Sequence, residues 1–264
     1  MKHHNLNVQF ALMMLIIITC FSCSKTDIDR PANLDCTLEK EIIYKTNPKS
    51  TIYQCIMDKE VKLGLRGVIL LVKNDSGFYV GASGMADIKE GIKMQPCHIS
   101  KIASVTKFEL GVAMMRLQEK GILSLDDPIS KYISKDILDK ISNGNEPLTI
   151  RNLLNHTSGI YDIIDDPGFY LQVLNHPTKK WNADDLLKFL YHKDAAFKFN
   201  PAENSGYSNS NYTLLSMIIE AATNKPHAQI MHEEFIDVLG LKDTYYFWHD
   251  PLPSQKVAQG YYNL

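Results

Sequence analysis

The sequence predicts an α+β fold, in which an antiparallel sheet flanked by helices is joined to a helical lobe. Residues 67–73 form a short run rich in β-branched side chains, and Asn74-Asp75-Ser76-Gly77 is a strong hairpin signal. Residues 78–82 supply the returning strand. From residue 126 to residue 222 the pattern is mostly helical, with long connections. Two strands followed by a helical insertion indicate an α+β fold with a helical lobe.

Two helices flank the predicted hairpin in the chain. Residues 36–62 are expected to form a helix that breaks near Asn47-Pro48, and residues 105–120 a second helix that ends at Gly121, a good C-terminal cap. The second helix carries two apolar stripes, made of Val105, Phe108, Val112 and Met115 and of Leu110, Met114 and Leu117. Two stripes predict a helix that is buried on most sides, as a central helix between lobes would be.

Composition favours a single catalytic unit. The 264 residues are 45% hydrophobic and 22% charged, which is enough to bury a sizeable core. A formal net charge of −2 and the lack of a basic stripe give no electrostatic reason to expect nucleic acid as a partner. We therefore expect residues 36–264 to form one folded unit, either as one large domain or as two interleaved lobes.

The N-terminus has the features of a secretory signal. Lys2, His3 and His4 precede an apolar stretch over residues 8–19, and small residues follow it up to Cys23. The apolar stretch is shorter than the roughly 20 residues that span a bilayer. Residues 1–22 are predicted to be the signal peptide, Cys23 the lipidated residue and residues 23–35 the anchor and tether. A plain cleaved signal with a free cysteine is the alternative, and either way the mature chain is expected to work outside the cytoplasm.

The other cysteines and the histidines do not form a recognisable metal site. Cys36, Cys55 and Cys97 remain in the mature chain, and Cys36 and Cys55 can pair in an oxidising compartment. His227 and His232 are five residues apart and lack the spacing of a metalloprotease site, so surface or capping roles are favoured. No metal or cofactor is predicted.

The first catalytic signal is Ser104-Val105-Thr106-Lys107, at the start of the second helix. Residues three apart share a helix face, so Lys107 is expected beside the Ser104 hydroxyl, which needs a neighbouring base to act as a nucleophile. A lysine among apolar side chains loses solvation and can exchange a proton with the serine. The alternative is a helix-capping serine followed by a solvated lysine.

The second catalytic signal is the loop around Tyr207. Polar residues and glycine surround this tyrosine, and an amphipathic helix follows it. A tyrosine at the mouth of a cleft with a lysine nearby can have a lowered phenol pKa and serve as a general base. Asn209 offers an amide donor and a carbonyl acceptor for a substrate amide. The alternative is that Tyr207 packs and that Ser208 or Asn209 caps the next helix.

Taken together, these residues resemble the serine penicillin-recognising enzymes. The resemblance is strongest to the branch that holds class C β-lactamases, D-alanyl-D-alanine carboxypeptidases and related esterases. It runs from about Gly67 to the C-terminus. The matching blocks, in family order, are residues 84–87, the S-x-x-K box at 102–107, residues 119–128, residues 148–160 and the Y-x-N box at 207–209. The resemblance implies a β-lactamase/transpeptidase-like fold.

The resemblance also implies a role for each of these positions. Ser104 would be the nucleophile that forms an acyl-enzyme, and its backbone N–H would supply half of the oxyanion hole. Lys107 would activate the serine and relay its proton. Tyr207 would act as general base in acylation and again when water attacks the acyl-enzyme. Asn209 would orient the substrate.

Other residues in the matching blocks are expected to be structural or depart from the family pattern. His156 is expected to be a buried, hydrogen-bonded histidine, and residues 126–128 a turn and helix start. Glu109 stands where the family has an apolar or aromatic residue. If buried, it needs a partner and can disturb the ionisation of Lys107. Ala202 and Asn211 replace usual glycines.

The third family motif, K-T-G, H-T-G or H-S-G, is not found after Tyr207. No Lys or His after Asn209 is followed two residues later by Gly. Relatives are expected to continue for some 100 residues, so the resemblance implies a C-terminally truncated chain. The missing part would carry the remaining strands of the sheet and the second oxyanion donor.

Two functions remain open. The first is a serine hydrolase that forms an acyl-enzyme on Ser104 and acts on an amide or ester. The substrate would be a D-Ala-D-Ala-type peptide, which can derive from peptidoglycan, or a small ester. β-Lactamase activity is less favoured. The second is a catalytically inactive binding or scaffold lipoprotein of the same fold. In both cases we expect a bacterial periplasmic or outer-membrane protein that is held at the membrane by a lipid on Cys23.

Overall fold

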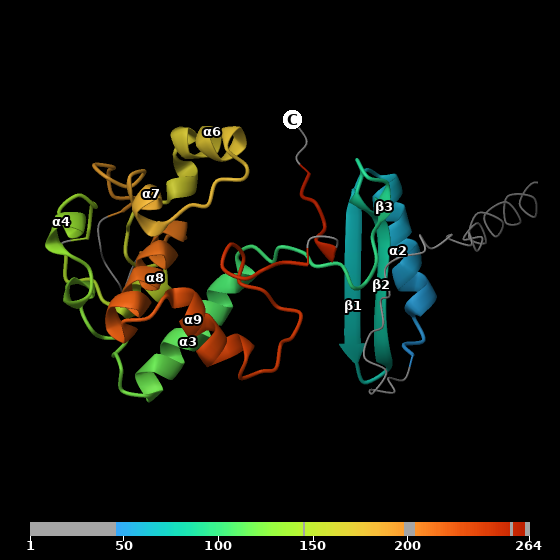
Figure 1. Ribbon diagram of the computed structural model, residues 1–264, viewed down its shortest axis with the longest axis horizontal. Coiled ribbons are helices and arrows are strands. Elements are labelled where there is room, and N and C mark those ends of the chain that lie inside the picture. The colour runs from blue at the N-terminus through green and yellow to red at the C-terminus, as the bar shows by residue number, and fades with distance from the viewer. Residues whose placement is uncertain (1–45, 145, 198–203, 254–255, 262–264) are drawn as a thin grey trace, which may run out of the picture. The chain divides into compact units, whose positions relative to one another are not determined.

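The computed structural model describes residues 46–144, 146–197, 204–253 and 256–261 (Figure 1). The predictions about the signal peptide, Cys23 and the tether lie outside these ranges. The chain divides into two compact units, one made of residues 1–100 with 253–264 and the other of residues 101–252. No helix within the described ranges is long and apolar enough to cross a membrane.

The first unit contains the predicted hairpin. Strands β1 (Gly67–Asn74) and β2 (Gly77–Asp87) pair antiparallel, with Asn74 opposite Gly77 at the turn. A short strand, β3 (Ile92–Lys93), adds to the other edge of β2, so the sheet order is β1-β2-β3. The returning strand is longer than predicted and continues to Asp87, because its final residues pair with β3.

Helix α2 (Ser50–Lys62) runs beside this sheet (Figure 1). Its polar side chains bind the sheet: Gln54 accepts a hydrogen bond from Tyr79 Oη at 2.8 Å, and Asp58 accepts one from Ser83 Oγ at 2.7 Å. The helix begins after Asn47-Pro48, as predicted, and residues 36–45 lie outside the description. Cys55 of α2 is disulfide-bonded, as is Cys97. The pairing of Cys55 with Cys36 stays a prediction, because Cys36 is not described.

The second unit is helical. Its elements are α3 (Val105–Glu119), η1 (Ile129–Lys131), α4 (Lys135–Leu138), α5 (Ile150–Leu154), η2 (Ile163–Asp165), α6 (Pro167–Asn175), α7 (Ala183–Leu187), α8 (Asn209–Thr223), α9 (His227–Met231) and the π-helical turn η3 (His232–Ile236). Its core is made of apolar side chains from α3, α5, α8 and α9, with further ones from the short helices η1, α4, η2 and α7 and from loops. Four apolar residues of α8 are fully buried there: Leu214, Leu215, Ile218 and Ile219.

Helix α3 confirms the extent of the predicted central helix. It ends just before Gly121, which has a φ of +67°. One predicted stripe, represented by Met114 and Leu117, is fully buried within the helical unit. In the other stripe, Phe108 and Met115 are not covered by side chains of this unit. Burial of this second stripe between lobes stays a prediction.

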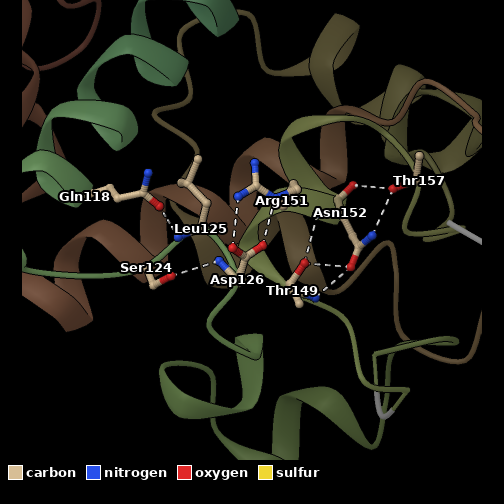
Figure 2. Close-up of polar contacts among 8 residues, drawn as sticks. All are labelled: Gln118, Ser124, Leu125, Asp126, Thr149, Arg151, Asn152 and Thr157. Carbon is tan, nitrogen blue, oxygen red and sulfur yellow. Dashed lines mark hydrogen bonds and ion pairs between the residues drawn. The ribbon is translucent and has the colours of Figure 1, made fainter.

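Polar contacts tie the connection after α3 to helix α5 (Figure 2). Asp126 accepts two hydrogen bonds from Arg151, at 2.8 and 3.0 Å. Thr149 and Asn152 form a capping box at the start of α5, in which each side chain accepts from the backbone N–H of the other residue. These contacts confirm that residues 126–128 belong to a structural turn rather than to a pair of catalytic carboxylates.

Candidate active site

Ser104 stands at the N-terminal end of α3 with its hydroxyl free of any capping role. It is the N-cap residue of the helix, yet its side chain makes no capping hydrogen bond. The residue before it, Ala103, has a φ of +47°, a left-handed conformation that a residue with a Cβ adopts at a cost in energy. The alternative interpretation of Ser104 as a capping serine is therefore wrong.

The Ser104 hydroxyl instead contacts both predicted proton carriers. Tyr207 Oη donates a hydrogen bond to Ser104 Oγ at 2.7 Å, and Lys107 Nζ donates one at 3.3 Å. Lys107 reaches the serine from one turn further along α3, whereas Tyr207 comes from the loop before α8. The fold thus joins two groups that are about 100 residues apart in the sequence around a single oxygen atom.

Asn209, the first residue of α8, holds Lys107 in place. Its Oδ1 accepts a hydrogen bond from Lys107 Nζ at 2.7 Å. The same ammonium group lies 5.1 Å from the ring centre of Tyr207 and 5.3 Å from that of Tyr212, within the range of cation–π attraction. Ser104, Lys107, Tyr207 and Asn209, the four predicted site residues, therefore lie together.

Sequence reasoning did not identify Asp162, which completes this group. Its side chain is buried, and both carboxylate oxygens accept from Asn209 Nδ2, at 2.9 and 3.3 Å. An amide whose NH₂ group faces a carboxylate must turn its carbonyl oxygen the other way, here towards Lys107. Asp162 thus fixes the orientation of Asn209. Nothing in its local sequence distinguishes it, because its partner is 47 residues away in the chain.

The loop that carries Asp162 is fastened to the start of α8. Ser210 Oγ donates to the carbonyl oxygen of Tyr161 at 2.7 Å and accepts from the N–H of Ile163 at 3.1 Å. Ser208 Oγ also donates to Tyr161 and makes no capping bond, so the alternative reading of Ser208 as a helix cap is wrong. These contacts hold Asp162 and Asn209 in a fixed relation.

His156 supports the loop around Tyr207. Its ring stacks on that of Tyr207 at a centroid distance of 4.5 Å, and its Nδ1 accepts a hydrogen bond from the N–H of Ser208 at 3.0 Å. Burial, and then the charge of Lys107, lower the pKa of His156, so the ring is neutral at pH 7. Asn211 Nδ2 lies 3.3 Å from the same Nδ1. His156 is hydrogen-bonded, as predicted, although it is only partly buried.

The pKa of Tyr207 is shifted in the direction that suits a base. Burial alone would raise it, but hydrogen bonds to Lys107 and Ser104, together with the charge of Lys107, outweigh burial and bring the pKa below its ordinary value of 10. The side chain is 53% exposed, so a substrate and water can reach it. This confirms the expected lowering of the phenol pKa.

Glu109 lies close enough to Tyr246 to affect its ionisation. It is partly buried, and burial raises its pKa. Its charge acts on Tyr246, whose pKa is raised to about 12 by burial and then by Glu109 and Glu220. The departure of Glu109 from the family pattern therefore changes the surroundings of Tyr246.

His227 and His232, which lack the spacing of a metalloprotease site, each lie beside carboxylates. His227 Nδ1 lies 2.7 Å from Glu220, and His232 lies 3.0 Å from Asp237 and 3.0 Å from Asp250. Within the described ranges, no group of three or more His, Cys, Asp or Glu side chains is arranged to hold a metal ion.

Comparison with known proteins places the chain in a family. The model of the family described as Beta-lactamase matches residues 52–263, and the chain therefore belongs to the beta-lactamase family. Protein flp of Staphylococcus aureus (strain MW2) is 33% identical over 179 residues, which cover 67% of this chain and 34% of that protein. The D-alanyl-D-alanine-carboxypeptidase/endopeptidase AmpH of Escherichia coli (strain K12) is 29% identical over 192 residues, covering 73% and 47%. The chain thus spans about a third to a half of the length of these curated relatives.

Solved structures agree with this assignment. The D-amino acid amidase of Ochrobactrum anthropi SV3, complexed with L-phenylalanine amide, matches with a TM-score of 0.64 and 28% identity over 80% of this chain and 57% of that one. A D-stereospecific amidohydrolase from Streptomyces sp. matches with a TM-score of 0.64 and 26% identity, over 74% and 56%. The fold is β-lactamase/transpeptidase-like, as predicted.

Proposed function

We propose that the protein is a serine hydrolase that forms an acyl-enzyme on Ser104 with an amide or ester substrate. The observation that carries this proposal is the position of Ser104 Oγ, 2.7 Å from Tyr207 Oη and 3.3 Å from Lys107 Nζ. A serine hydroxyl becomes a nucleophile when an adjacent group takes its proton. Both adjacent groups can carry protons, and family membership supports this chemistry.

Acylation follows from this geometry. Tyr207, as the phenolate, accepts the proton of Ser104 while Oγ bonds to the substrate carbonyl carbon. The carbonyl oxygen takes the negative charge and faces the backbone N–H of Ser104. When the C–N or C–O bond breaks, Tyr207 returns the proton to the leaving group. Lys107 is held by Asn209, and its hydrogen bond and charge lower the pKa of Tyr207, which favours the ionised form of the phenol.

In deacylation, water is the nucleophile and the Ser104 oxygen is the leaving group. A water molecule loses a proton to Tyr207, attacks the ester carbonyl carbon, and the proton passes to Ser104 as the acyl group leaves. For the substrate we propose a D-Ala-D-Ala-type peptide or a small amide or ester. The relatives named for carboxypeptidase and D-amino acid amidase activity support this class.

A fluorophosphonate probe tests the nucleophile. The full chain should be labelled covalently, and Ser104→Ala should abolish labelling, whereas Ser134→Ala, an exposed serine of the same unit, should leave it unchanged. The labelled peptide is identified by mass spectrometry. Absence of labelling, or labelling that survives Ser104→Ala, would show that the proposed nucleophile is wrong.

We also propose that the protein is exported to the periplasm or outer membrane and anchored through Cys23. The basic start, the apolar stretch over residues 8–19 and the small residues before Cys23 support this. Metabolic labelling with palmitate should mark the wild-type chain and not the Cys23→Ala variant. Equal labelling of both would contradict the anchor.

A further inference from the structure

A cavity of about 440 Å³ opens beside the catalytic lysine in the helical unit. Lys107 and Asn209 line it, so it adjoins the group of residues around Ser104. Its walls are largely apolar and aromatic, and include Trp181, Tyr212 and Tyr246. No step of the proposed reaction uses these aromatic side chains. Their presence indicates room for a part of the substrate other than its reacting carbonyl.

The cavity also reaches a carboxylate. Glu220 lies on the same face of α8 as Asn209, about three turns further along, which is about 16 Å at 1.5 Å per residue. Its Oε1 accepts from the backbone N–H of His227 at 3.1 Å and lies 2.7 Å from His227 Nδ1. Among the described residues, Oε2 has no hydrogen-bond partner. The side chain is 47% exposed, so a ligand can reach this oxygen.

The groups around Glu220 leave its negative charge available. Burial would raise the pKa of Glu220, but the hydrogen bonds from His227 outweigh burial and lower it, so the carboxylate is ionised at pH 7. Burial lowers the pKa of His249, and the phenol pKa of Tyr246 is about 12, so these two side chains are neutral there. Two lysines also line the cavity: Lys107, which is held by Asn209 at the Ser104 end, and Lys180, which is exposed and whose charge helps to lower the pKa of His249. Among the described residues that line the cavity, Glu220 is the only carboxylate.

We propose that this cavity binds the ammonium group of the substrate, with Glu220 as its counter-ion and the aromatic walls around an apolar stem. At the Glu220 end of the cavity, about three helical turns from the Asn209 that holds Lys107, an ammonium group gains from the carboxylate and from the faces of aromatic rings, whereas a carboxylate group placed there would be repelled by Glu220. The ligand class is a chain with an apolar body and a terminal amine. The inference rests on the proposed function in one respect, that the other end of the ligand is the acyl group received by Ser104.

Binding can be measured without any reaction at Ser104. The full chain carries two tryptophans, Trp181 in the cavity and Trp248 elsewhere, so a Ser104→Ala, Trp248→Phe background reports on Trp181 by fluorescence. Octylammonium, 1-octanol and octanoate differ only in their end group and serve as probes. The test variant is Glu220→Gln, and the matched control is Glu233→Gln, a nearby glutamate that is paired with Lys225 outside the cavity.

Octylammonium is expected to bind about three- to tenfold more tightly than octanol, because a half-exposed ion pair with an aromatic contribution changes affinity by about that factor. Octanoate is expected to bind more weakly than both. Glu220→Gln should remove the preference for the amine, and Glu233→Gln should keep it. Equal affinities for the three probes, or an amine preference that survives Glu220→Gln, would overturn the inference. Failure of the fluorophosphonate to label Ser104 would instead overturn the proposed function and leave the amine site standing.

Discussion

Asn209 links Lys107 to a buried carboxylate. Its Oδ1 accepts from Lys107 and its Nδ2 donates to Asp162, so each end of the amide has a charged partner. Hydrogen bonds to charged groups are stronger than those between neutral groups. An amide flip would set its NH₂ against an ammonium and its oxygen against a carboxylate. Asp162 therefore acts through Asn209 as a positioning residue for Lys107.

Asp162→Asn should slow acylation of Ser104. The new side chain can present its own NH₂ to Asn209, which removes the preference for the amide orientation that Lys107 needs. Losing one hydrogen bond to a charged group is worth about 1.5–3 kcal/mol, so the fluorophosphonate labelling rate should fall about 10- to 100-fold. Asp165→Asn, an exposed carboxylate of the same loop, is the control. Wild-type labelling rates in Asp162→Asn would contradict the positioning role.

The lowered pKa of Tyr207 predicts how the rate of Ser104 labelling depends on pH. Because its pKa lies below 10, the phenolate forms at a lower pH than in a free tyrosine, and the labelling rate should rise with pH and level off above that lowered pKa. Tyr207→Phe should remove the rise and slow labelling at the plateau by about 10²-fold or more, the usual contribution of a general base. Labelling rates measured from pH 6 to 10 check this, with Tyr170→Phe as the control. A rising limb that persists in Tyr207→Phe would assign the base elsewhere.

At the scale of elements, α3 is held to η3 by a buried carboxylate. Glu234 of η3 is 3% exposed, and it pairs with Arg116 at 3.0 Å and with Lys120 near the end of α3. Both cations are partly exposed, at 35% and 47% of their side-chain surface. The pairing fixes the helix that carries Ser104 and Lys107 at its opposite end.

Glu234→Gln should therefore destabilise the helical unit. The amide has the size of the carboxylate but not its charge, and the loss of two charge-assisted hydrogen bonds to half-exposed partners should lower the free energy of unfolding by about 1–3 kcal/mol. Urea unfolding followed by circular dichroism measures it. Glu233→Gln, whose partner Lys225 is exposed, should change stability little. Equal effects of the two variants would show that burial of Glu234 is unimportant.

For the whole molecule, we predict ester turnover that depends on Ser104. The site brings Tyr207 and Lys107 to the Ser104 hydroxyl, and the proposed function uses these groups in both acylation and deacylation. The full chain should therefore hydrolyse p-nitrophenyl acetate, and Ser104→Ala should reduce the rate to that of the uncatalysed reaction. Equal rates with the two proteins would contradict this prediction.

Local patterns in the sequence were enough to predict the hairpin, the extent of α3 and the buried face of α8. Each depends on neighbours within a few residues, through turn chemistry or helical periodicity. The Ser104–Lys107 pair also belongs to this class, because a spacing of three sets both side chains on one helix face. The role of Tyr207 needed the family resemblance as well, because its loop has no periodicity.

Only the tertiary structure decided which distant side chains meet. It placed Tyr207 against Ser104, Asp162 against Asn209 and Glu220 in the cavity beside Lys107. These outcomes depend on which elements pack together, and the periodicity of one segment does not encode the identity of its partner. The sequence by itself determined that Ser104 and Lys107 share one helix face, because their spacing is local, and packing determined which distant side chains surround them and how Lys107 is held.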